Sequence, residues 1–356
     1  MTRTLRTAAV AAIASVGLLA GSPTPIGGAV ALAAPASPQL AASPTVARPL
    51  RNAPAANAVR VATYNVMKTS RMASRWSWSK RRNALRNTVR AASPDVLAVQ
   101  EANTQRWNGG THVEDVRRIL AGLGYQIGSR NYTSCTSGCT RGSHIFFKSS
   151  RMRLVRLPKS GVRAAGMTGI SRIAAKGLGG IQDRNVSWAF LSPRGSSRTT
   201  LYVSVHLPTQ KTAHGERLRV AVASRLRPWA DQLIRRSGLR NVELVIAGDF
   251  NSFQRRQPRG AQTVLAQAGL IDGFTAPVKV NAHYGTVNYT PQTNKYQGFP
   301  PRPHYYKRNT TRIDYVFSTV RPQRHEVVLH LTGKGTFDNR FRASDHNMVM
   351  VDLSLR

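Results

Sequence analysis

The sequence predicts an α/β protein in which two β-sheets pack face to face and helices cover their outer sides. Three observations favour this fold class. Strand and helix patterns alternate in the first half of the chain, and strand patterns crowd together in the second half. The periodic segments span roughly 300 residues, a length that suits one large domain.

Periodicity locates the elements of the first half. Strands show apolar or β-branched residues in alternation or in short runs, whereas helices repeat apolar residues three or four positions apart. The helix expected over residues 80–92 carries Leu85 and Val89 four positions apart and ends before Pro94. A second helix is expected over residues 113–123. Strands are expected over residues 60–66, 95–100, 144–148, 153–157, 186–191 and 201–206.

The second half begins with a long helix and continues mainly as strands. The helix expected over residues 216–234 presents Leu218 and Val222 on one face. A short helix is expected over residues 262–268. The polar stretch 281–309 is rich in Tyr and Pro and is expected to be a long loop, of the kind that often carries function. Further strands are expected over residues 242–247, 312–317, 327–331 and 348–353.

The start of the chain precedes the predicted fold. Arg3 and Arg6 come before an apolar stretch and A-x-A patterns, which are typical of a secretory signal peptide over residues 1–33. A disordered apolar tail is the alternative. An Ala- and Pro-rich linker is expected over residues 34–57, which leaves residues 58–356 as the folded domain. The apolar stretch is too short to span a bilayer, so we expect a secreted protein without stable membrane insertion. Nothing in the sequence suggests more than a monomer.

The chain is strongly basic, with a formal net charge of +37. Removal of the predicted signal peptide would take away two arginines and no acidic residue, which leaves +35. Of the 52 basic residues, 42 are Arg and 10 are Lys, and the guanidinium group binds phosphate oxygens in bidentate geometry. The charge therefore favours a polyanionic phosphate partner such as nucleic acid. An Arg-rich composition that reflects a G+C-rich genome is the alternative.

Cys135 and Cys139 are the only two cysteines of the chain. In an exported protein, a pair this close is expected to form a disulfide that stiffens the loop over residues 131–142. The closed loop is so small that the gain in stability would be only about 2 kcal/mol. A C-x3-C metal site is the weaker alternative, because the chain offers no further cysteine.

Polar residues recur where the predicted strands end. In VIAGDFNSF, residues 245–253, an apolar run stops at Gly248 and is followed by Asp249 and Asn251. Residues two apart in a strand point the same way, so these two side chains can lie side by side, and the glycine allows a close approach of the backbone. A turn with Asx hydrogen bonds is the alternative. The other ends carry Asn65 in TYNV, Glu101 in LAVQE, His206 in VSVHL, Asp314 in RIDYVF, and Asp345 and His346 in ASDHNM.

The ordered set YN, QE, H, GDFN, IDY and SDH resembles the endonuclease/exonuclease/phosphatase superfamily. This superfamily includes pancreatic deoxyribonuclease, abasic-site endonucleases, bacterial sphingomyelinases and inositol polyphosphate phosphatases. The resemblance covers about residues 59–356. It implies a four-layer αββα sandwich of two packed mixed sheets, as in deoxyribonuclease, with a site for metal-dependent phosphoester hydrolysis at one end of the sheets.

The resemblance also implies roles for the polar strand ends. The metal is expected on Glu101, helped by Asn65, and Asp345 would share it. Mg²⁺ is the expected ion, with Mn²⁺ or Ca²⁺ as alternatives, because this hard cation prefers few carboxylates and several waters. His346 would accept a proton from the attacking water, and Asp314 would orient its ring.

The remaining polar residues would act on the phosphate. His206 would donate a hydrogen bond or a proton toward the phosphate or the leaving oxygen. Asp249 and Asn251 would bind and orient the phosphate or the nucleophilic water. In the deoxyribonuclease branch, a glutamate before FFK supports the equivalent of His206, but here that region reads TRGSHIFFK. The proton-donating role of His206 is therefore in doubt, and His144 in this stretch is expected to be a hydrogen-bonded strand residue.

The first expectation for the substrate is DNA, or RNA, cleaved by a secreted nuclease. In RMASRWSWSKRR, Trp76 and Trp78 lie among basic residues that include Arg81 and Arg82. Aromatic rings among cations can stack bases and hold backbone phosphates. The alternative for this stretch is the solvated start of a helix with one tryptophan packed. A second basic and aromatic stretch, PPRPHYYKRN at residues 300–309, would flank the site or form a plain loop.

Other functions compete with the nuclease. A phospholipase C that acts on sphingomyelin would need an exposed apolar hairpin, and the tryptophan pair is the nearest candidate in the sequence. A phosphatase for a small phosphate ester is the third possibility. A non-catalytic cationic protein that only binds polyanions is a different class, and the intact motif set argues against it.

Overall fold

The computed structural model describes residues 57–69, 76–128, 142–158, 161–170, 173, 184–253, 260–288, 302–303, 305 and 312–354. All of these residues belong to one unit, Pro44–Arg356. The predicted signal peptide, nearly all of the predicted linker, and Cys135 and Cys139 lie outside the described residues. The domain boundaries and the disulfide therefore stay predictions.

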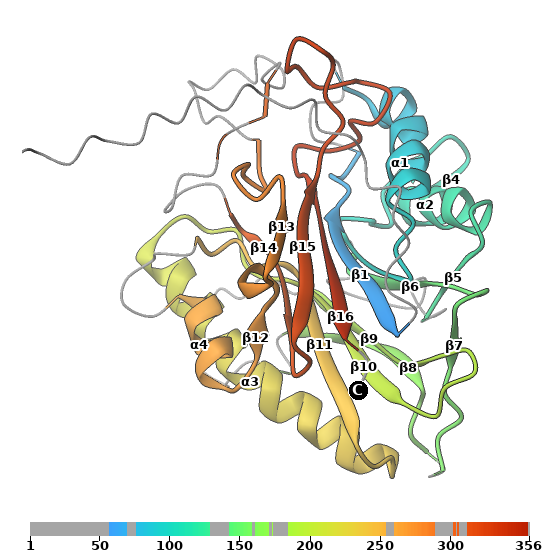
Figure 1. Ribbon diagram of the computed structural model, residues 1–356, viewed down its shortest axis with the longest axis vertical. Coiled ribbons are helices and arrows are strands. Elements are labelled where there is room, and N and C mark those ends of the chain that lie inside the picture. Colours follow the sequence, from blue (N-terminus) through green and yellow to red (C-terminus); the bar gives the residue numbers. More distant parts are fainter. Residues whose placement is uncertain are drawn as a thin grey trace, which may run out of the picture. The chain divides into compact units, whose positions relative to one another are not determined.

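Two mixed sheets carry most of the strands (Figure 1). The order of the first sheet is β13 (Val278–Val280), β15 (Pro322–Val328), β16 (Met348–Ser354), β1 (Ala58–Asn65), β2 (Val96–Gln100), β6 (His144–Lys148) and β5 (Tyr125–Ile127). Within it, β1 runs parallel to β2 and antiparallel to β16. Because β1 and β2 are parallel, their carboxyl ends meet at the same edge of the sheet.

The second sheet has the order β12 (Ile271–Asp272), β14 (Asp314–Ser318), β11 (Val242–Asp249), β10 (Thr199–His206), β9 (Asn185–Pro193) and β7 (Met152–Leu154). Strand β8 (Ala165–Gly169) also pairs with β9. Here β10 and β11 are parallel, and β14 runs antiparallel to β11. The carboxyl ends of β10 and β11 therefore lie beside the start of β14. A separate ribbon pairs β3 (Arg106–Trp107) with β4 (Gly110–Thr111).

Helices cover the outer face of each sheet, which gives four layers (Figure 1). The helices are α1 (Trp78–Ala92) and α2 (His112–Ala121) on the first sheet, and α3 (Ala213–Ser237) and α4 (Ala261–Gln267) on the second. Side chains of β1 alternate between two cores. Ala62 and Tyr64 pack toward the helices, and Val59 and Val61 pack between the sheets. Both faces of this strand are thus buried.

Local signals fix the ends of two helices. The Thr111 side chain accepts a hydrogen bond from the backbone of Glu114 and the Glu114 carboxylate accepts one from the backbone of Thr111, a capping box at the start of α2. At the start of α3, the Thr212 hydroxyl accepts a hydrogen bond from the backbone of Gly215. This helix ends at Gly238, whose φ of 75° favours glycine.

The expected fold class is confirmed, and each expected helix or strand has a counterpart in the structure. The strand expected over residues 327–331 is β15, which begins at Pro322 and ends at Val328. The short strands β3, β4, β5, β8, β12 and β13 were not expected, because their two to five residues contain no apolar run like those of β2, β6 and β14. No helix in the described part of the chain is long and apolar enough to cross a membrane.

Candidate active site

Three neighbouring strands of the second sheet bring polar residues together in register. His206 ends β10 and pairs with Asp249, the last residue of β11, and Asp249 pairs with Asp314, the first residue of β14. Gly248 precedes Asp249, and a Cβ atom there would lie 2.0 Å from the carbonyl oxygen of Val205. The glycine is therefore needed for the close approach of β11 to β10.

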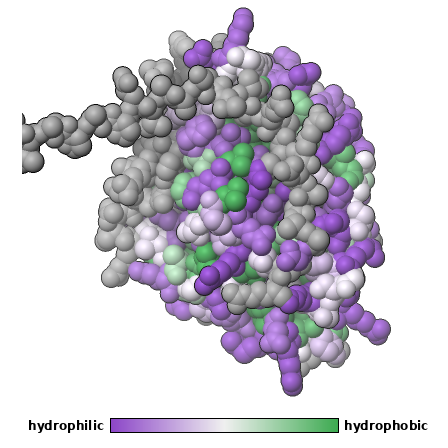
Figure 2. Space-filling model, viewed as in Figure 1, coloured by the Kyte–Doolittle hydropathy of each residue, from purple (hydrophilic) through white to green (hydrophobic). Residues whose placement is uncertain are grey.

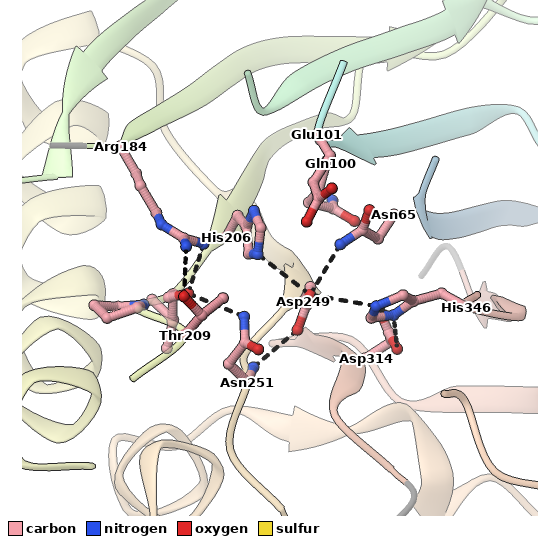
Figure 3. Close-up of polar contacts among 12 residues, drawn as sticks. Asn65, Gln100, Glu101, Arg184, His206, Thr209, Asp249, Asn251, Asp314 and His346 are labelled. Carbon is pink, nitrogen blue, oxygen red and sulfur yellow. Dashed lines mark hydrogen bonds and ion pairs between the residues drawn. The ribbon is translucent and has the colours of Figure 1, made fainter. Parts of the chain in front are cut away.

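Two strands of the first sheet supply the opposite side of the site. Asn65 ends β1 and pairs with Gln100 at the end of β2, and Glu101 follows directly. The Asn65 Nδ2 donates to Asp249 Oδ2 at 3.0 Å, and the Gln100 Nε2 donates to the hydroxyl of Ser204 in β10 at 3.1 Å. These bonds join the two sheets, and the polar side chains of both converge at one end of the strands (Figure 3).

The backbone turns sharply where these strands end. Met67, Glu101 and Asn251 have φ values of 53°, 63° and 48°, in the left-handed region. For residues other than glycine, this conformation costs about 1 kcal/mol or more each and tends to cluster at functional sites. Two of the turns are held by the site itself, because Asn65 Oδ1 accepts from the Met67 amide and Asp249 Oδ1 accepts from the Asn251 amide.

Asp249 contacts residues from both sheets and is 2% exposed. Besides accepting from Asn65, its Oδ2 lies 3.3 Å from His206 Nε2 and 3.8 Å from His346 Nε2. Burial would raise the pKa of Asp249, but the two histidines and the amide of Asn251 hold the pKa well below its usual range. The carboxylate is thus an anion held between two imidazole rings.

His346 and Asp314 form a buried pair. The His346 Nδ1 lies 2.9 Å and 3.1 Å from the two carboxylate oxygens of Asp314. Burial raises the pKa of Asp314, and in His346 the carboxylates of Asp314 and Asp249 outweigh burial and raise the pKa of the imidazole. The Thr286 hydroxyl oxygen accepts from the Ile313 and Asp314 amides at 3.0 Å and 3.2 Å. The ring of His346 is therefore fixed with Nε2 on the side of Asp249.

Glu101 and Asp345 form the acidic part of the site. Glu101 is 8% exposed, and its Oε2 accepts from the Lys68 amide at 2.8 Å. Asp345 is 3% exposed, and its Oδ1 accepts from the Ser344 hydroxyl at 3.3 Å. Both carboxylates act electrostatically on the buried guanidinium of Arg81. Such hard oxygen donors fit a divalent cation of the Mg²⁺ type.

A second group of side chains could also hold a metal ion. Ligand atoms of Asp249, Asp314 and His346 all lie within 4.8 Å of one another, and the three residues are buried. The family resemblance implied that Asp249 orients the phosphate or the water, that His346 accepts a proton from the water, and that Asp314 orients the ring of His346. It assigned none of the three to the metal. Their grouping means that a cation near Asp249 would sit beside the same imidazole that we expect to move a proton.

Arg184 belongs to the site, although the sequence did not single it out. It precedes β9 and is 2% exposed, and its guanidinium donates to the carbonyl oxygen of Leu207 at 2.9 Å and to the hydroxyl of Thr209 at 3.2 Å. The side-chain Nδ2 of Asn251 donates to the same Leu207 carbonyl oxygen at 3.1 Å (Figure 3). Burial lowers the pKa of His206, and the charge of Arg184 lowers it further. Its only sequence signal was an arginine two residues before the strand expected over residues 186–191.

The segment before and within α1 is packed into the protein. Trp78 is 1% exposed, its Nε1 donates to Asp115 Oδ2 at 2.8 Å, and its ring meets the ring of His112 edge-on at 4.3 Å between centroids. Arg81 is fully buried. The structure therefore argues against the expected substrate contact of Trp78 and Arg81, because the indole nitrogen of Trp78 and the guanidinium of Arg81 already bond to groups of the chain itself.

Arg81 instead braces two loops of the site. Its Nη1 donates to the carbonyl oxygens of Val66 at 2.6 Å and Ala343 at 2.8 Å, and its Nη2 donates to those of Met67 at 2.5 Å and Lys68 at 3.0 Å. Val66, Met67 and Lys68 follow β1, and Ala343 precedes Asp345. Arg81 thus fixes the loop that follows Asn65 and the loop that leads to Asp345.

Two other candidates for substrate binding are partly exposed. The Arg82 guanidinium donates to Asp115 at 2.8 Å and 3.0 Å, and the side chain is 26% exposed. Trp76 is half-buried, with the Arg342 guanidinium 5.8 Å from the centre of its ring. Substrate contact by Trp76 and Arg82 stays a prediction. His144 is buried in β6 with its Nε2 2.9 Å from the carbonyl oxygen of Ala102, as expected of a hydrogen-bonded strand residue.

With the fold and the site in place, the comparisons with known proteins give the family. A model of the endonuclease/exonuclease/phosphatase family matches residues 62–346, so the chain belongs to this family. Its members hydrolyse phosphoesters and generally use a divalent metal ion. A search of curated proteins gave no match.

Solved structures with this fold support the architecture. An endonuclease/exonuclease/phosphatase family protein from Bacteroides thetaiotaomicron superposes with a TM-score of 0.60 at 19% identity, over 84% of this chain and 98% of that chain. A mannosyl-6-phosphatase of the same organism gives 0.59 at 18% identity, over 83% and 99%. The human Nocturnin catalytic domain with bound sulfate gives 0.54 at 18% identity, over 84% and 93%. At these identities the likeness concerns the fold alone.

Proposed function

We propose that this protein is a secreted, metal-dependent phosphodiesterase that hydrolyses nucleic acid, DNA in the first place and RNA in the second, by in-line attack of water. The observation that carries the proposal is the buried arrangement around Asp249, in which two imidazoles and an amide meet one carboxylate. No covalent intermediate is needed, since the site offers groups that position water and phosphate and stabilise charge.

His346 activates the water in this proposal. Asp314 holds the Nδ1 side of the ring, so Nε2 is the atom that accepts a proton from the attacking water. Asp249 lies beside this Nε2 and orients the water, and it stabilises the imidazolium that results. The proton therefore ends on His346, between two carboxylates.

The metal belongs to Glu101, with Asn65 and Asp345 in supporting roles. A bound Mg²⁺, or Mn²⁺ or Ca²⁺ in its place, would polarise the phosphoryl oxygen and oppose protonation of His346 by its charge. Asn65 directs its amide oxygen to Met67 and its amide nitrogen to Asp249, so its contribution is to link the metal side of the site to the Asp249 side.

His206 and Asn251 bind the phosphate. Burial and the charge of Arg184 keep the pKa of His206 low, so its ring donates a hydrogen bond as a neutral imidazole. Asn251 is oriented by its bond to the Leu207 carbonyl, which Arg184 also holds. Arg184 is thus a positioning residue, because it fixes Leu207 directly after His206, and the Asn251 side chain bonds to the same Leu207 carbonyl.

Nucleic acid is favoured over lipid by charge and by surface. A net charge of +37 suits a polyanion. Among the described residues, the exposed large hydrophobic side chains are only Leu154, Val278 and Tyr305, and they lie in different segments. The face seen in Figure 2 is mainly hydrophilic where it is coloured. The described residues therefore contain no exposed apolar hairpin that could insert into a membrane.

Secretion is part of the proposal and rests on the pattern of residues 1–33. Expression of the full chain in a bacterial host and sequencing of the amino terminus of the protein recovered from the medium test this part. A mature terminus near residue 34 is expected. A protein that stays in the cells with Met1 intact would overturn it.

The activity is tested with a panel of substrates. Supercoiled plasmid, single-stranded RNA, sphingomyelin vesicles and mannose 6-phosphate are each incubated with the purified protein in Mg²⁺ or in EDTA. We expect metal-dependent cleavage of plasmid or RNA, and loss of that cleavage in Glu101→Gln without a change in the melting temperature. Phosphocholine release with intact nucleic acid would show a phospholipase C, and phosphate release from the sugar alone would show a monoesterase.

A further inference from the structure

Two cationic side chains lie on neighbouring loops at the metal side of the site, and the proposed mechanism uses neither charge. Lys68 is in the loop that follows β1, and Arg106 is in β3, the first strand of the hairpin that follows Glu101. Arg106 is exposed and Lys68 is half-buried. Among the described residues, no side chain forms an ion pair or a hydrogen bond with the Lys68 ammonium or the Arg106 guanidinium. Both charges are therefore available to an anionic ligand.

The two loops are bonded to each other and to the expected metal ligand. The Thr69 hydroxyl donates to Gln105 Oε1 at 2.8 Å, and Lys68 and Arg106 are the chain neighbours of these two residues. The Lys68 amide donates to Glu101 Oε2 at 2.8 Å. The two cations thus come from loops that meet beside the carboxylate of Glu101.

The hairpin holds the backbone of Arg106 in place. Its turn residues Asn108 and Gly109 have φ values of 47° and 79°, as in the tight two-residue turn that matches the twist of paired strands. The guanidinium of Arg82 in α1 lies 5.3 Å from the centre of the Trp107 ring. Because side chains alternate along a strand, Arg106 points to the side opposite to Trp107, away from α1. A backbone that is already ordered adds little cost when Arg106 binds an anion.

We infer that Lys68 and Arg106 form a second phosphate subsite, which holds the phosphate next to the one that is cleaved. The inference rests on the proposed function and narrows its substrate to a chain of at least two phosphodiesters. Two cations near a metal-binding carboxylate repel the metal ion, and a substrate that brings a second phosphate relieves this repulsion. Guanidinium and ammonium groups both bind phosphate oxygens. Sphingomyelin and mannose 6-phosphate each carry one phosphate, so neither can fill both positions.

The test compares a substrate that has many phosphates with one that has a single phosphate. Values of kcat/KM are measured in Mg²⁺ for oligonucleotides of about a dozen deoxythymidines or uridines and for bis(p-nitrophenyl) phosphate. We expect Arg106→Gln and Lys68→Gln each to lower the ratio of the oligonucleotide value to the diester value at least about fivefold. The slope of log kcat/KM for the oligonucleotide against log salt concentration should become less steep by about 0.7 in each variant. Arg117→Gln removes the same charge from an exposed position of α2 and is the control, which should keep the wild-type ratio and slope.

The outcomes separate this inference from the proposed function. If oligonucleotides are cleaved but both variants keep the wild-type ratio and slope, or if Arg117→Gln lowers them as much, the subsite is overturned and the nuclease stays in place. An effect in only one of the two variants overturns the shared subsite and leaves a single contact. If the wild type hydrolyses bis(p-nitrophenyl) phosphate or mannose 6-phosphate but no oligonucleotide, the nuclease and the subsite are both overturned.

Discussion

Two aromatic and basic segments of this protein look alike in sequence and differ in the structure. The first contains Trp78 and Arg81 at the start of α1, and the second contains Tyr305 in the loop before β14. Trp78 is 1% exposed and Tyr305 is 64% exposed. The rings of the first segment lie on His112 and Asp115 of α2, whereas those of the second lie on each other. Two segments of similar composition are thus buried in one place and exposed in the other.

The difference teaches what aromatic and basic residues need in order to bind nucleic acid. An Arg or Trp that finds partners in its own chain has no free face for a phosphate or a base. Arg81 has four carbonyl oxygens as partners. Composition of a segment cannot show this, because the partners come from elements distant in the sequence.

The largest effect is expected for Arg81→Met. The change removes donors from four carbonyl oxygens and leaves buried acceptors unsatisfied, so the free energy of unfolding should fall by about 3 kcal/mol or more. Urea titration followed by circular dichroism measures it. Arg90→Met, at an exposed position of the same helix, is the control and should change little. An Arg81→Met protein that is as stable as wild type but binds nucleic acid weakly would contradict the structural role of Arg81 and would place it on the substrate.

A smaller effect is expected from pH through Asp115. Burial would raise the pKa of Asp115, but hydrogen bonds from Arg82 and Trp78 hold it below the ordinary value of 3.8. The carboxylate therefore stabilises the fold above that value, and this stability is lost as pH falls through the folded pKa. Melting temperatures down to about pH 2 should thus fall less steeply for Asp115→Asn than for wild type. If the melting temperatures of wild type and Asp115→Asn fall in parallel with pH, ionisation of Asp115 does not contribute to the stability of the fold.

The smallest expected effect is on the salt dependence of nucleic-acid binding. The slope of the logarithm of affinity against the logarithm of salt concentration reports phosphate contacts and not stacking. Trp76→Ala, at the half-buried ring that the sequence predicts to stack a base, should therefore weaken single-strand binding at every salt concentration and leave the slope unchanged. Arg82→Gln checks the expected substrate contact of Arg82, because an unchanged slope would mean that its guanidinium stays paired with Asp115. A slope that falls by about 1 in Arg82→Gln would place this arginine on a phosphate and would narrow the difference between the two segments.

The sequence predicted the features that depend on neighbours in the chain. Period and length located the helices and the longer strands, and the polar ends of the apolar runs gave His206, Asp249 and Asp314, which the register of β10, β11 and β14 then brings side by side. Register itself was not predicted from the residues, because pairing partners lie far apart in the chain.

The missed features depend on tertiary contacts. Arg184 and Thr286 carry no motif, and their importance follows from one carbonyl at Leu207 and one amide at Asp314. The burial of Trp78 and Arg81 follows from helix α2 and from the loop before β16. The positive φ angles of Met67 and Glu101 likewise follow from how the strands end against each other.

The central claim is that residues from separate strand ends form one hydrolytic unit around Asp249. It is tested most directly by kcat/KM for a chromogenic diester, bis(p-nitrophenyl) phosphate, in wild type, Asp314→Asn, His346→Ala and the double variant. Because Asp314 acts through the ring of His346, the double variant should be no slower than the slower single variant. Effects that multiply in the double variant would contradict the claim, since they would mean that the two residues act independently.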